Sequence, residues 1–395
     1  MKRTNDGICW LAALAWVCGL AGCASAPPVP PPQAPAGLFV DVAFEAPSHP
    51  IDARQVFALS PAMQHYLEVE IAPQLRSMGP QRGLVDALHR KAQLRLDYDT
   101  DITRTAAEAF DARSGNCLSL VVMSAALAKH LGLPVQYQAL VGQETWSRSG
   151  DLSFVNGHVN LTVARRLVDR LAAFDADTRL QLEFGALPSG RASLLRVVSE
   201  ATIVAMFMNN RAAETLVQGA ISDAYAYARE AVIQAPDHAG SYNTLGVIYQ
   251  RRGLAAAAEV AYGHALSRDA EHRAAMLNLA RLLEGQGRGA EAAPWRAALA
   301  RLEAEPPFQH FDLGRAAAQA GDFRSARELI LREMRRDPDY HEFHFWLAVA
   351  LYGLGEVSQA REHLTIAMQN STTRREQAIY AAKLQGLAPT TPRSQ

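Results

Sequence analysis

A glycine recurs every 34 residues through the second half of the chain. The series is Gly219, Gly253, Gly287, Gly321 and Gly355. Two more series of small residues keep the same step: Ala224, Ala258, Ala292, Ala326 and Ala360, and Ala212, Gly246, Ala280, Gly314 and Ala348. Small residues let two antiparallel helices approach closely, and a glycine supplies the left-handed residue that ends a helix. The period therefore predicts an all-α solenoid of stacked helix pairs.

The length of this period and its small residues resemble tetratricopeptide repeats. A leucine precedes the small residue in four repeats, at Leu245, Leu279, Leu313 and Leu347. The resemblance implies five repeats over residues 205–372 and a polar capping helix and tail over residues 373–395. Within the second repeat, Ala258 is expected to lie opposite Gly246, where the two helices come closest.

Such stacks bind a peptide, a partner protein or a neighbouring domain. The repeat pattern predicts these residues on the inner, concave face: Asn243, Arg251, Arg281, Phe311, Arg315, Phe345 and Tyr352. Arginine interleaved with aromatic residues suits a groove for a protein or peptide partner. The alternative, that these positions are solvated or pack between repeats, stays open.

The first residues of the chain read as an export signal. Lys2 and Arg3 precede an apolar run over residues 8–20, which is 13 residues long. That is shorter than the roughly 20 residues that a membrane-spanning helix needs. The run closes on Leu20-Ala21-Gly22-Cys23, which resembles the bacterial lipoprotein signal.

This second resemblance implies removal of residues 1–22, lipid attachment to Cys23, and a proline-rich tether over residues 23–37. The lipid is expected to hold the protein on the membrane. Because Ala24 and not aspartate follows Cys23, the expected location is the periplasmic face of the outer membrane. Without the signal the formal charge is about −2, so nothing indicates a nucleic-acid partner.

The chain has four cysteines, of which Cys117 alone lies outside the signal and the lipidation site. Single leftover thiols in exported proteins are candidates for reactive groups. An apolar helical pattern over residues 118–131 follows Cys117, so the cysteine opens a helix. The helix dipole and the free N–H groups there predict a lowered thiol pKa. A buried structural cysteine is the alternative.

Period-two alternation predicts a strand over residues 135–141 and a second over residues 157–163, with His158 near its start. A third strand is predicted over residues 171–174, ending at Asp175. The Gly-x-Cys at the helix start, the Gly-His strand and the final aspartate resemble the transglutaminase-like (papain-like) superfamily over roughly residues 90–180.

The resemblance implies an α+β domain over residues 38–204, with Cys117 as nucleophile, His158 as its base and Asp175 orienting the imidazole. Asn116 departs from the aspartate that more commonly precedes the nucleophile. Asp177 stays open as the third member. Asp169 and Asp151 fit the spacing less well.

Residues 38–95 form a lead-in to this domain, with a strand predicted over residues 38–42 and helices over residues 63–69 and 84–96. A short helix is predicted over residues 104–110. No metal and no cofactor are expected, because His264, His272, His341 and His344 fall in the repeats without convincing ligand spacing.

The sequence thus favours a lipid-anchored, periplasm-facing thiol enzyme, a cysteine peptidase, amidase or acyltransferase. It would form a thioester that water or an amine resolves. One alternative is a catalytically inactive repeat scaffold lipoprotein that organises an envelope or secretion assembly. Another is a redox or thioester-sensing role for Cys117, although no second cysteine is present for a dithiol oxidoreductase.

Overall fold

The computed structural model describes residues 33–89, 94, 96–99, 102–141, 145–149, 152–156, 158–165, 179–184, 194–302, 308–335, 337–371 and 374–387. The chain divides into two compact units, Met1–Gln33 and Ala34–Gln395. The predicted signal over residues 1–22 and the predicted lipidation site Cys23 lie outside the described residues. Every described helix and strand belongs to the second unit.

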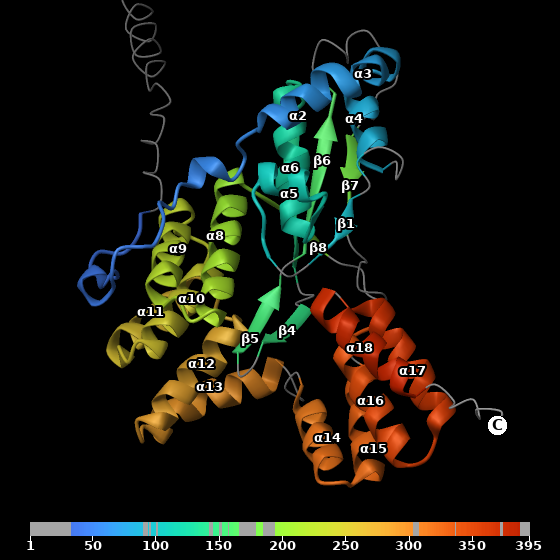
Figure 1. Cartoon of the computed structure of the whole chain (residues 1–395). Helices are drawn as coiled ribbons and strands as arrows, with labels where there is room; N and C mark the ends of the chain where they lie inside the picture. The colour runs from blue at the N-terminus through green and yellow to red at the C-terminus, as the bar shows by residue number, and fades with distance from the viewer. Residues whose placement is uncertain are drawn as a thin grey trace, which may run out of the picture. The chain divides into compact units, whose positions relative to one another are not determined.

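The α+β part is built on a four-stranded antiparallel sheet in the order β7-β6-β3-β8. Its strands are β3 (Val135–Val141), β6 (Val159–Ala164), β7 (Arg179–Leu182) and β8 (Leu194–Val198). β3 and β6 confirm two predicted strands, and α6 (Cys117–His130) packs against both (Figure 1). The strand predicted over residues 171–174 lies outside the described residues.

Short helices and two small strand pairs complete this part. They are α2 (Pro61–His65), the π-helix η4 (Tyr66–Glu70), α3 (Ala72–Met78), α4 (Pro80–His89), α5 (Ala106–Ala112), the parallel pair β1 (Asp97–Tyr98) and β2 (Ser114–Gly115), and the hairpin β4 (Thr145–Ser149) and β5 (Leu152–Asn156). The predicted helix over residues 63–69 is present as α2 and η4. Of the helix predicted over residues 84–96, the described part lies in α4 up to His89, and Leu94 and Leu96 are not helical.

The strand predicted over residues 38–42 does not form. These residues instead lead into the 3₁₀ turn η2 (Asp41–Ala43). The backbone groups of Leu38 and Val40 form hydrogen bonds with a side chain of a repeat helix and not with a neighbouring strand. The hydroxyl of Tyr249 donates to Leu38 O at 2.8 Å and accepts from Val40 N at 3.2 Å. A second short turn, η3 (Ala53–Gln55), follows.

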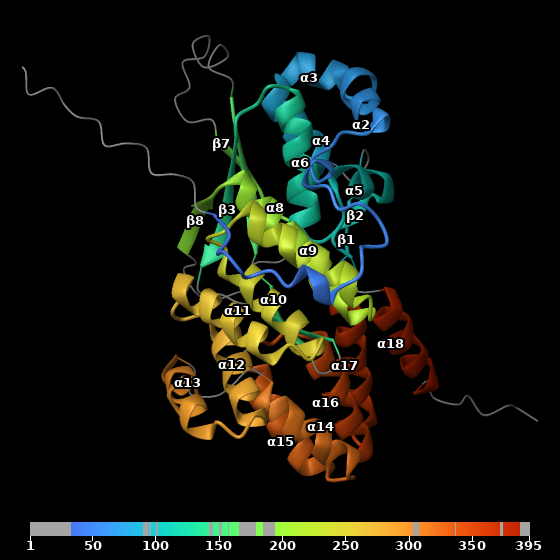
Figure 2. The same ribbon diagram turned by 90° about the vertical axis from the view of Figure 1, so that its left-hand side faces the viewer.

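Residues 38–49 form a strap over the first repeats. Phe44 stacks on Tyr225 with ring centroids 3.9 Å apart, and Asp41 accepts hydrogen bonds from Tyr225 Oη at 2.7 Å and Arg229 Nε at 3.0 Å. The strap, drawn in blue, crosses α9 in Figure 2. The lead-in therefore docks on the repeats before it enters the α+β part.

Five helix pairs in the described residues confirm the predicted repeats. They are α8 (Glu200–Val217) with α9 (Ile221–Gln234), α10 (Ala239–Arg251) with α11 (Ala255–Arg268), α12 (Arg273–Gly285) with α13 (Gly289–Leu302), α14 (Gln309–Gln319) with α15 (Phe323–Met334), and α16 (His341–Gly353) with α17 (Val357–Asn370). α18 (Arg374–Gly386) packs on α17 as the capping helix. All five periodic glycines have φ between 76° and 85°, the left-handed region in which other residues are strained.

The closest approach within the second repeat differs from the expected pair. A Cβ at Gly246 would lie 2.5 Å from the ring of Tyr262, so the aromatic ring and not Ala258 fills the space above this glycine. Ala258 is fully buried nearby. The expectation that Ala258 faces Gly246 at the closest contact is wrong, because the bulky residue one turn further along α11 covers the glycine.

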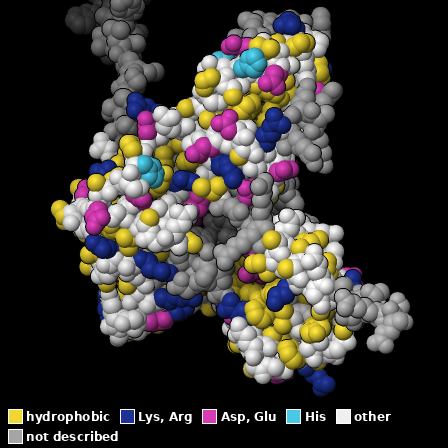
Figure 3. Space-filling view, in the orientation of Figure 1, with side chains coloured by type: hydrophobic (Ala, Val, Ile, Leu, Met, Phe, Trp, Pro, Cys, Tyr) yellow, Lys and Arg dark blue, Asp and Glu magenta, His cyan; other side chains and the backbone are white. Residues whose placement is uncertain are grey.

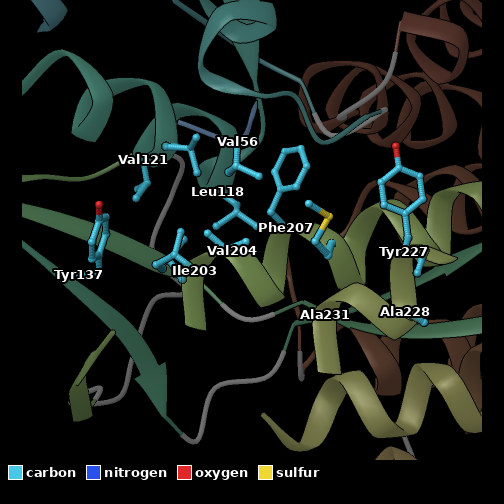
Figure 4. Packing of buried hydrophobic residues seen from close by; sticks show 14 of the residues in the cluster. Val56, Leu118, Val121, Tyr137, Ile203, Val204, Phe207, Tyr227, Ala228 and Ala231 are labelled. Atoms are coloured by element: carbon cyan, nitrogen blue, oxygen red, sulfur yellow. The ribbon is translucent and has the colours of Figure 1, made fainter. Parts of the chain in front are cut away.

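The buried apolar residues form two clusters. The first runs from Leu38 to Leu299 and joins the α+β part to the first three repeats, and the second runs from Phe308 to Tyr380. Figure 4 shows the junction, where Val56 and Leu118 lie beside Phe207 of α8. α8 begins at Glu200, so the predicted boundary after residue 204 falls inside this helix. The helix therefore belongs both to the α+β part and to the repeats.

Candidate functional site

Cys117 is the first residue of α6 and lies at the end of a tight turn. Arg113 ends α5 in the left-handed conformation with φ 51°, and Asn116 caps α6 by accepting from Ser119 N at 2.9 Å. A Cβ at Gly115 would lie 2.6 Å from Ser119 Cβ, so only glycine fits this approach. The local sequence thus fixes the thiol at the helix N-terminus, as predicted.

The thiol of Cys117 is free and partly buried. Burial raises its pKa, while the polar Val159 and Leu118 N–H groups and the Tyr98 hydroxyl act in the opposite direction. Burial outweighs these donors. The predicted lowering of the pKa is therefore wrong, although the predicted position at the helix start is confirmed.

His158 immediately precedes β6. Its carbonyl accepts from Leu140 N at 2.9 Å, which fixes the backbone at the start of the strand. Its Nε2 is buried and has no hydrogen-bond partner among the described residues. Burial lowers the pKa of the imidazole and Glu183 raises it, with burial the larger effect. The ring is therefore neutral at pH 7 and has a nitrogen available for a proton.

Glu183 is the carboxylate that the structure places near His158. It follows β7 directly, and β7 pairs with β6 so that Leu182 lies opposite Leu161. Asn160, which is buried, donates from Nδ2 to Glu183 Oε1 at 3.3 Å. The side chain of Glu183 is exposed and acts on His158 through its charge.

Sequence reasoning missed Glu183, although a signal was present. Leu180, Leu182 and Phe184 alternate with polar residues, which is typical of a strand, and Glu183 stands at its end. Asp175, the predicted third member, and its alternatives Asp177, Asp169 and Asp151 lie outside the described residues.

His158 and Asn160 flank Val159 at the start of β6, and Val159 is one of the residues whose N–H acts on the pKa of Cys117. Asn160 donates to Glu183, and the charge of Glu183 acts on His158. No hydrogen bond between the described residues joins His158 Nε2 to the Cys117 thiol. A neutral imidazole can accept a thiol proton, and a nearby carboxylate stabilises the cation that results. The arrangement suits nucleophilic chemistry by a thiol that is protonated at rest.

The predicted inner-face residues divide into two groups. Phe311 is 1 % exposed and packs against Phe308 and Phe343, so its assignment to a docking surface is wrong. Phe345 stacks on Tyr380 of the capping helix, with ring centroids 5.1 Å apart. Periodicity placed both on the correct helices but could not separate a concave surface from contacts between repeats.

The side chains of the other predicted inner-face residues are partly or fully exposed to solvent. Arg251, Arg281 and Tyr352 are exposed, and Arg315 is partly exposed and pairs with Asp312 at 3.5 Å. Asn243 is partly buried and accepts from Asn278 Nδ2 at 3.0 Å across two repeats. On the face in Figure 3, basic and acidic side chains are interspersed over the described residues.

The described residues offer neither a membrane span nor a metal site. None of the described helices is both long and apolar enough to cross a membrane. No group of three or more His, Cys, Asp or Glu side chains in this part of the chain is arranged to hold a metal ion.

Comparison with known proteins identifies the repeats. The family model of the tetratricopeptide repeat matches residues 311–372. No curated protein matches the chain. Together with the five helix pairs, the family match makes the C-terminal half an array of tetratricopeptide repeats, a class that binds peptide or protein partners.

Several solved structures are similar to part of this chain. YrrB, described as a TPR protein with an unusual peptide-binding site, is 19 % identical over 45 % of this chain and 92 % of its own, with a TM-score of 0.25. PilF of Pseudomonas aeruginosa is 20 % identical over 47 % and 93 %, with a TM-score of 0.27. A thermophilic TPR protein of Thermus thermophilus is 15 % identical over 46 % and 99 %, with a TM-score of 0.30.

Proposed function

We propose that this protein is a lipid-anchored thiol enzyme of the cell envelope, of the transglutaminase-like superfamily, that cleaves or transfers an amide acyl group. The repeats would dock the protein substrate or a partner. One observation supports the enzymatic part: Cys117 begins α6 and its pKa responds to Val159 of β6, and His158 immediately precedes Val159 in the chain. The anchor is proposed from the sequence of residues 20–23 alone.

Acylation begins with both reacting groups neutral. His158 takes the proton of the Cys117 thiol as the sulfur attacks the carbonyl carbon of the amide, and the carbonyl oxygen becomes an oxyanion. The Leu118 and Val159 N–H groups, which lower the pKa of the thiol, would be candidate donors to that oxyanion. Glu183 stabilises the imidazolium.

The imidazolium then gives its proton to the leaving amine as the C–N bond breaks, which leaves a thioester on Cys117. Water or an acceptor amine attacks the thioester, and His158 takes the proton of that nucleophile. When the C–S bond breaks, the proton returns to the sulfur and restores the thiol. The resemblance to bacterial relatives favours water as the acceptor.

An activated ester tests this chemistry without knowledge of the natural substrate. The full-length chain is mixed with p-nitrophenyl acetate, p-nitrophenolate release is followed, and acetylation of the Cys117 peptide is measured by mass spectrometry. We expect His158→Ala to slow acetylation on the order of 100-fold. Glu183→Gln removes one charged contact and should slow it roughly tenfold.

The matched control is Glu70→Gln, which removes an exposed carboxylate at the end of η4. It should acetylate at the parent rate. If Cys117 is acetylated equally fast in the parent and in His158→Ala, the imidazole does not activate the thiol and the enzymatic proposal fails.

A scaffold lipoprotein without turnover is the second candidate. The raised pKa of the buried Cys117 thiol favours it, because a protonated sulfur without an effective base is unreactive. The same assay separates the two: a scaffold shows no acetyl-Cys117 above the level of an unfolded control, and an enzyme forms and turns over the thioester.

The docking surface is proposed from the exposed predicted residues of the repeats, Arg251, Arg281 and Tyr352, with Asn243 and Arg315 at its partly buried positions. Exposed guanidinium groups and an exposed aromatic ring on one array suit a peptide with acidic and aromatic side chains. Phe311 and Phe345 are left out, because both pack inside the array.

A further inference from the structure

Thr103 is a fully buried residue that joins the α+β part to the first repeat helix. Its N–H donates to Glu214 Oε1 at 2.8 Å, and its carbonyl accepts from Arg211 Nη1 at 3.4 Å. Its hydroxyl oxygen accepts from Asn210 Nδ2 at 3.3 Å. All three partners belong to α8, so one loop residue is tied to one helix of the repeats.

The same hydroxyl also makes a hydrogen bond to the turn that precedes Cys117, residues 113–116. Asn116 Nδ2 donates to Thr103 Oγ1 at 2.8 Å, which fixes the amide whose oxygen caps α6. The neighbouring Arg104 N–H donates to Ser119 Oγ at 2.8 Å in the first turn of that helix. The hydrogen bonds therefore run without a gap from α8 through Thr103 to the residue before Cys117.

Glu214 is the ionisable member of this chain of hydrogen bonds. Burial raises its pKa to about 7, against the opposite effects of the Thr103 hydroxyl and N–H, Arg211 and Arg104. Arg211 Nη1 lies 3.6 Å from Glu214 Oε2, and Arg104 is itself paired with Asp99 at 3.0 Å. Neither arginine holds Glu214 fully ionised below neutral pH.

We propose that Glu214 is a positioning residue that acts through Thr103 and Asn116 to hold the first turn of α6, and so couples the repeat array to Cys117. The inference rests on the proposed function in taking Cys117 as the nucleophile. It adds a form of regulation, because whatever shifts α8 or protonates Glu214 reaches the thiol through hydrogen bonds.

The coupling follows from the hydrogen bonds that Thr103 makes on its two sides. Glu214 Oε1 accepts from the Thr103 N–H, while the two lone pairs of the Thr103 hydroxyl accept from Asn116 and Asn210. Protonation of Glu214 weakens its hydrogen bond to the Thr103 N–H, because a neutral carboxyl group is a weaker acceptor than a carboxylate. Thr103 is then held less firmly, and the cap of α6 loosens.

Alkylation of Cys117 by iodoacetamide tests this, because it requires the thiol and no substrate. Rates are measured on the full-length chain by peptide mass spectrometry from pH 5.5 to 8.5. A thiol below its pKa gains about tenfold in rate per pH unit. In the parent we expect a steeper rise near pH 7, where Glu214 ionises and the cap tightens.

Two variants decide the matter. Glu214→Gln keeps the acceptor oxygen and loses the ionisation, so the extra rise near pH 7 should vanish. Thr103→Val removes the hydroxyl and should slow alkylation at least threefold at every pH. The control is Thr215→Val on the same helix, which loses only a hydrogen bond to Arg211 O and should match the parent.

Persistence of the steeper rise in Glu214→Gln would overturn the proposal, as would identical rates in Thr103→Val and Thr215→Val. This alkylation test does not require His158 to act as a base. If His158→Ala leaves acetylation unchanged but Glu214→Gln flattens the alkylation profile, the enzymatic proposal fails and the coupling stands.

Discussion

Burial shifts the pKa values of Cys117 and His158 in opposite directions, up for the thiol and down for the imidazole, and both shifts favour the uncharged forms. In the proposed mechanism the proton would therefore move from the thiol to the imidazole during the attack on the substrate. Such a site would depend on the base more than one that stores a preformed thiolate.

The first prediction concerns the pKa of Cys117. Because burial dominates, we expect iodoacetamide alkylation of the folded parent to reach its plateau at a higher pH than alkylation of a short peptide containing cysteine. Rates across pH, read from the Cys117 peptide by mass spectrometry, check this. A plateau reached below that of the peptide would mean that the helix N-terminus outweighs burial.

The second prediction concerns Glu214 and stability. Between pH 4.5, its ordinary value, and about pH 7, the folded state keeps a proton that the unfolded state has lost. Stability therefore falls as pH rises through this interval, by roughly 3 kcal/mol at 1.36 kcal/mol per unit of pKa shift. Urea unfolding at pH 4.5, 6 and 8 measures it. Glu214→Gln should remove this part of the slope, and an unchanged slope would place the pKa near its ordinary value.

At the scale of the elements, two glycines of the second repeat should respond to alanine in opposite ways. Gly246→Ala drives a Cβ into the buried ring of Tyr262 and should destabilise by about 1–3 kcal/mol. Gly263→Ala on the exposed side of α11 meets nothing within 4 Å and should stabilise by about 0.5–1 kcal/mol. Urea midpoints measure both, and equal signs would contradict this packing.

The elements could be predicted wherever the pattern is local. The regular spacing of the glycines predicts the repeats, and the alternation of apolar and polar residues predicts β3. In both cases the pattern lies within the residues that form the helix pair or the strand. The register of β7 against β6 is not local, and it decides that Glu183 lies near His158. The burial that sets the pKa of Cys117 comes from distant segments such as the one carrying Tyr98. No short window of sequence contains that information.

At the scale of the whole molecule, the two separate cores predict two unfolding transitions. The first core joins the α+β part to the first three repeats, and the second holds the last two repeats and α18. Gly246→Ala should therefore lower the transition that also releases β6, and leave the other unchanged. Hydrogen exchange by mass spectrometry separates them. Protection of β6 that is unaffected by Gly246→Ala would show that the first core is divided.

The proposed lipid anchor is tested on the full-length chain. If Cys23 carries the lipid, Cys23→Ser should abolish incorporation of radiolabelled palmitate and release the protein from membranes washed with salt. Cys9→Ser, within the leader, is the matched control and should behave as the parent. Continued membrane association of Cys23→Ser after the wash would contradict the lipoprotein assignment.

The strap over the first repeats also decides how the protein carries mechanical load. A pull on the N-terminal end of the chain first meets the contacts of Leu38 and Val40 with Tyr249, then those of Asp41 with Tyr225 and Arg229. These lie on α9 and α10, so the force passes into the helices of the solenoid before it reaches α2. The turn that precedes Cys117 is thereby shielded from tension on the N-terminal end of the chain.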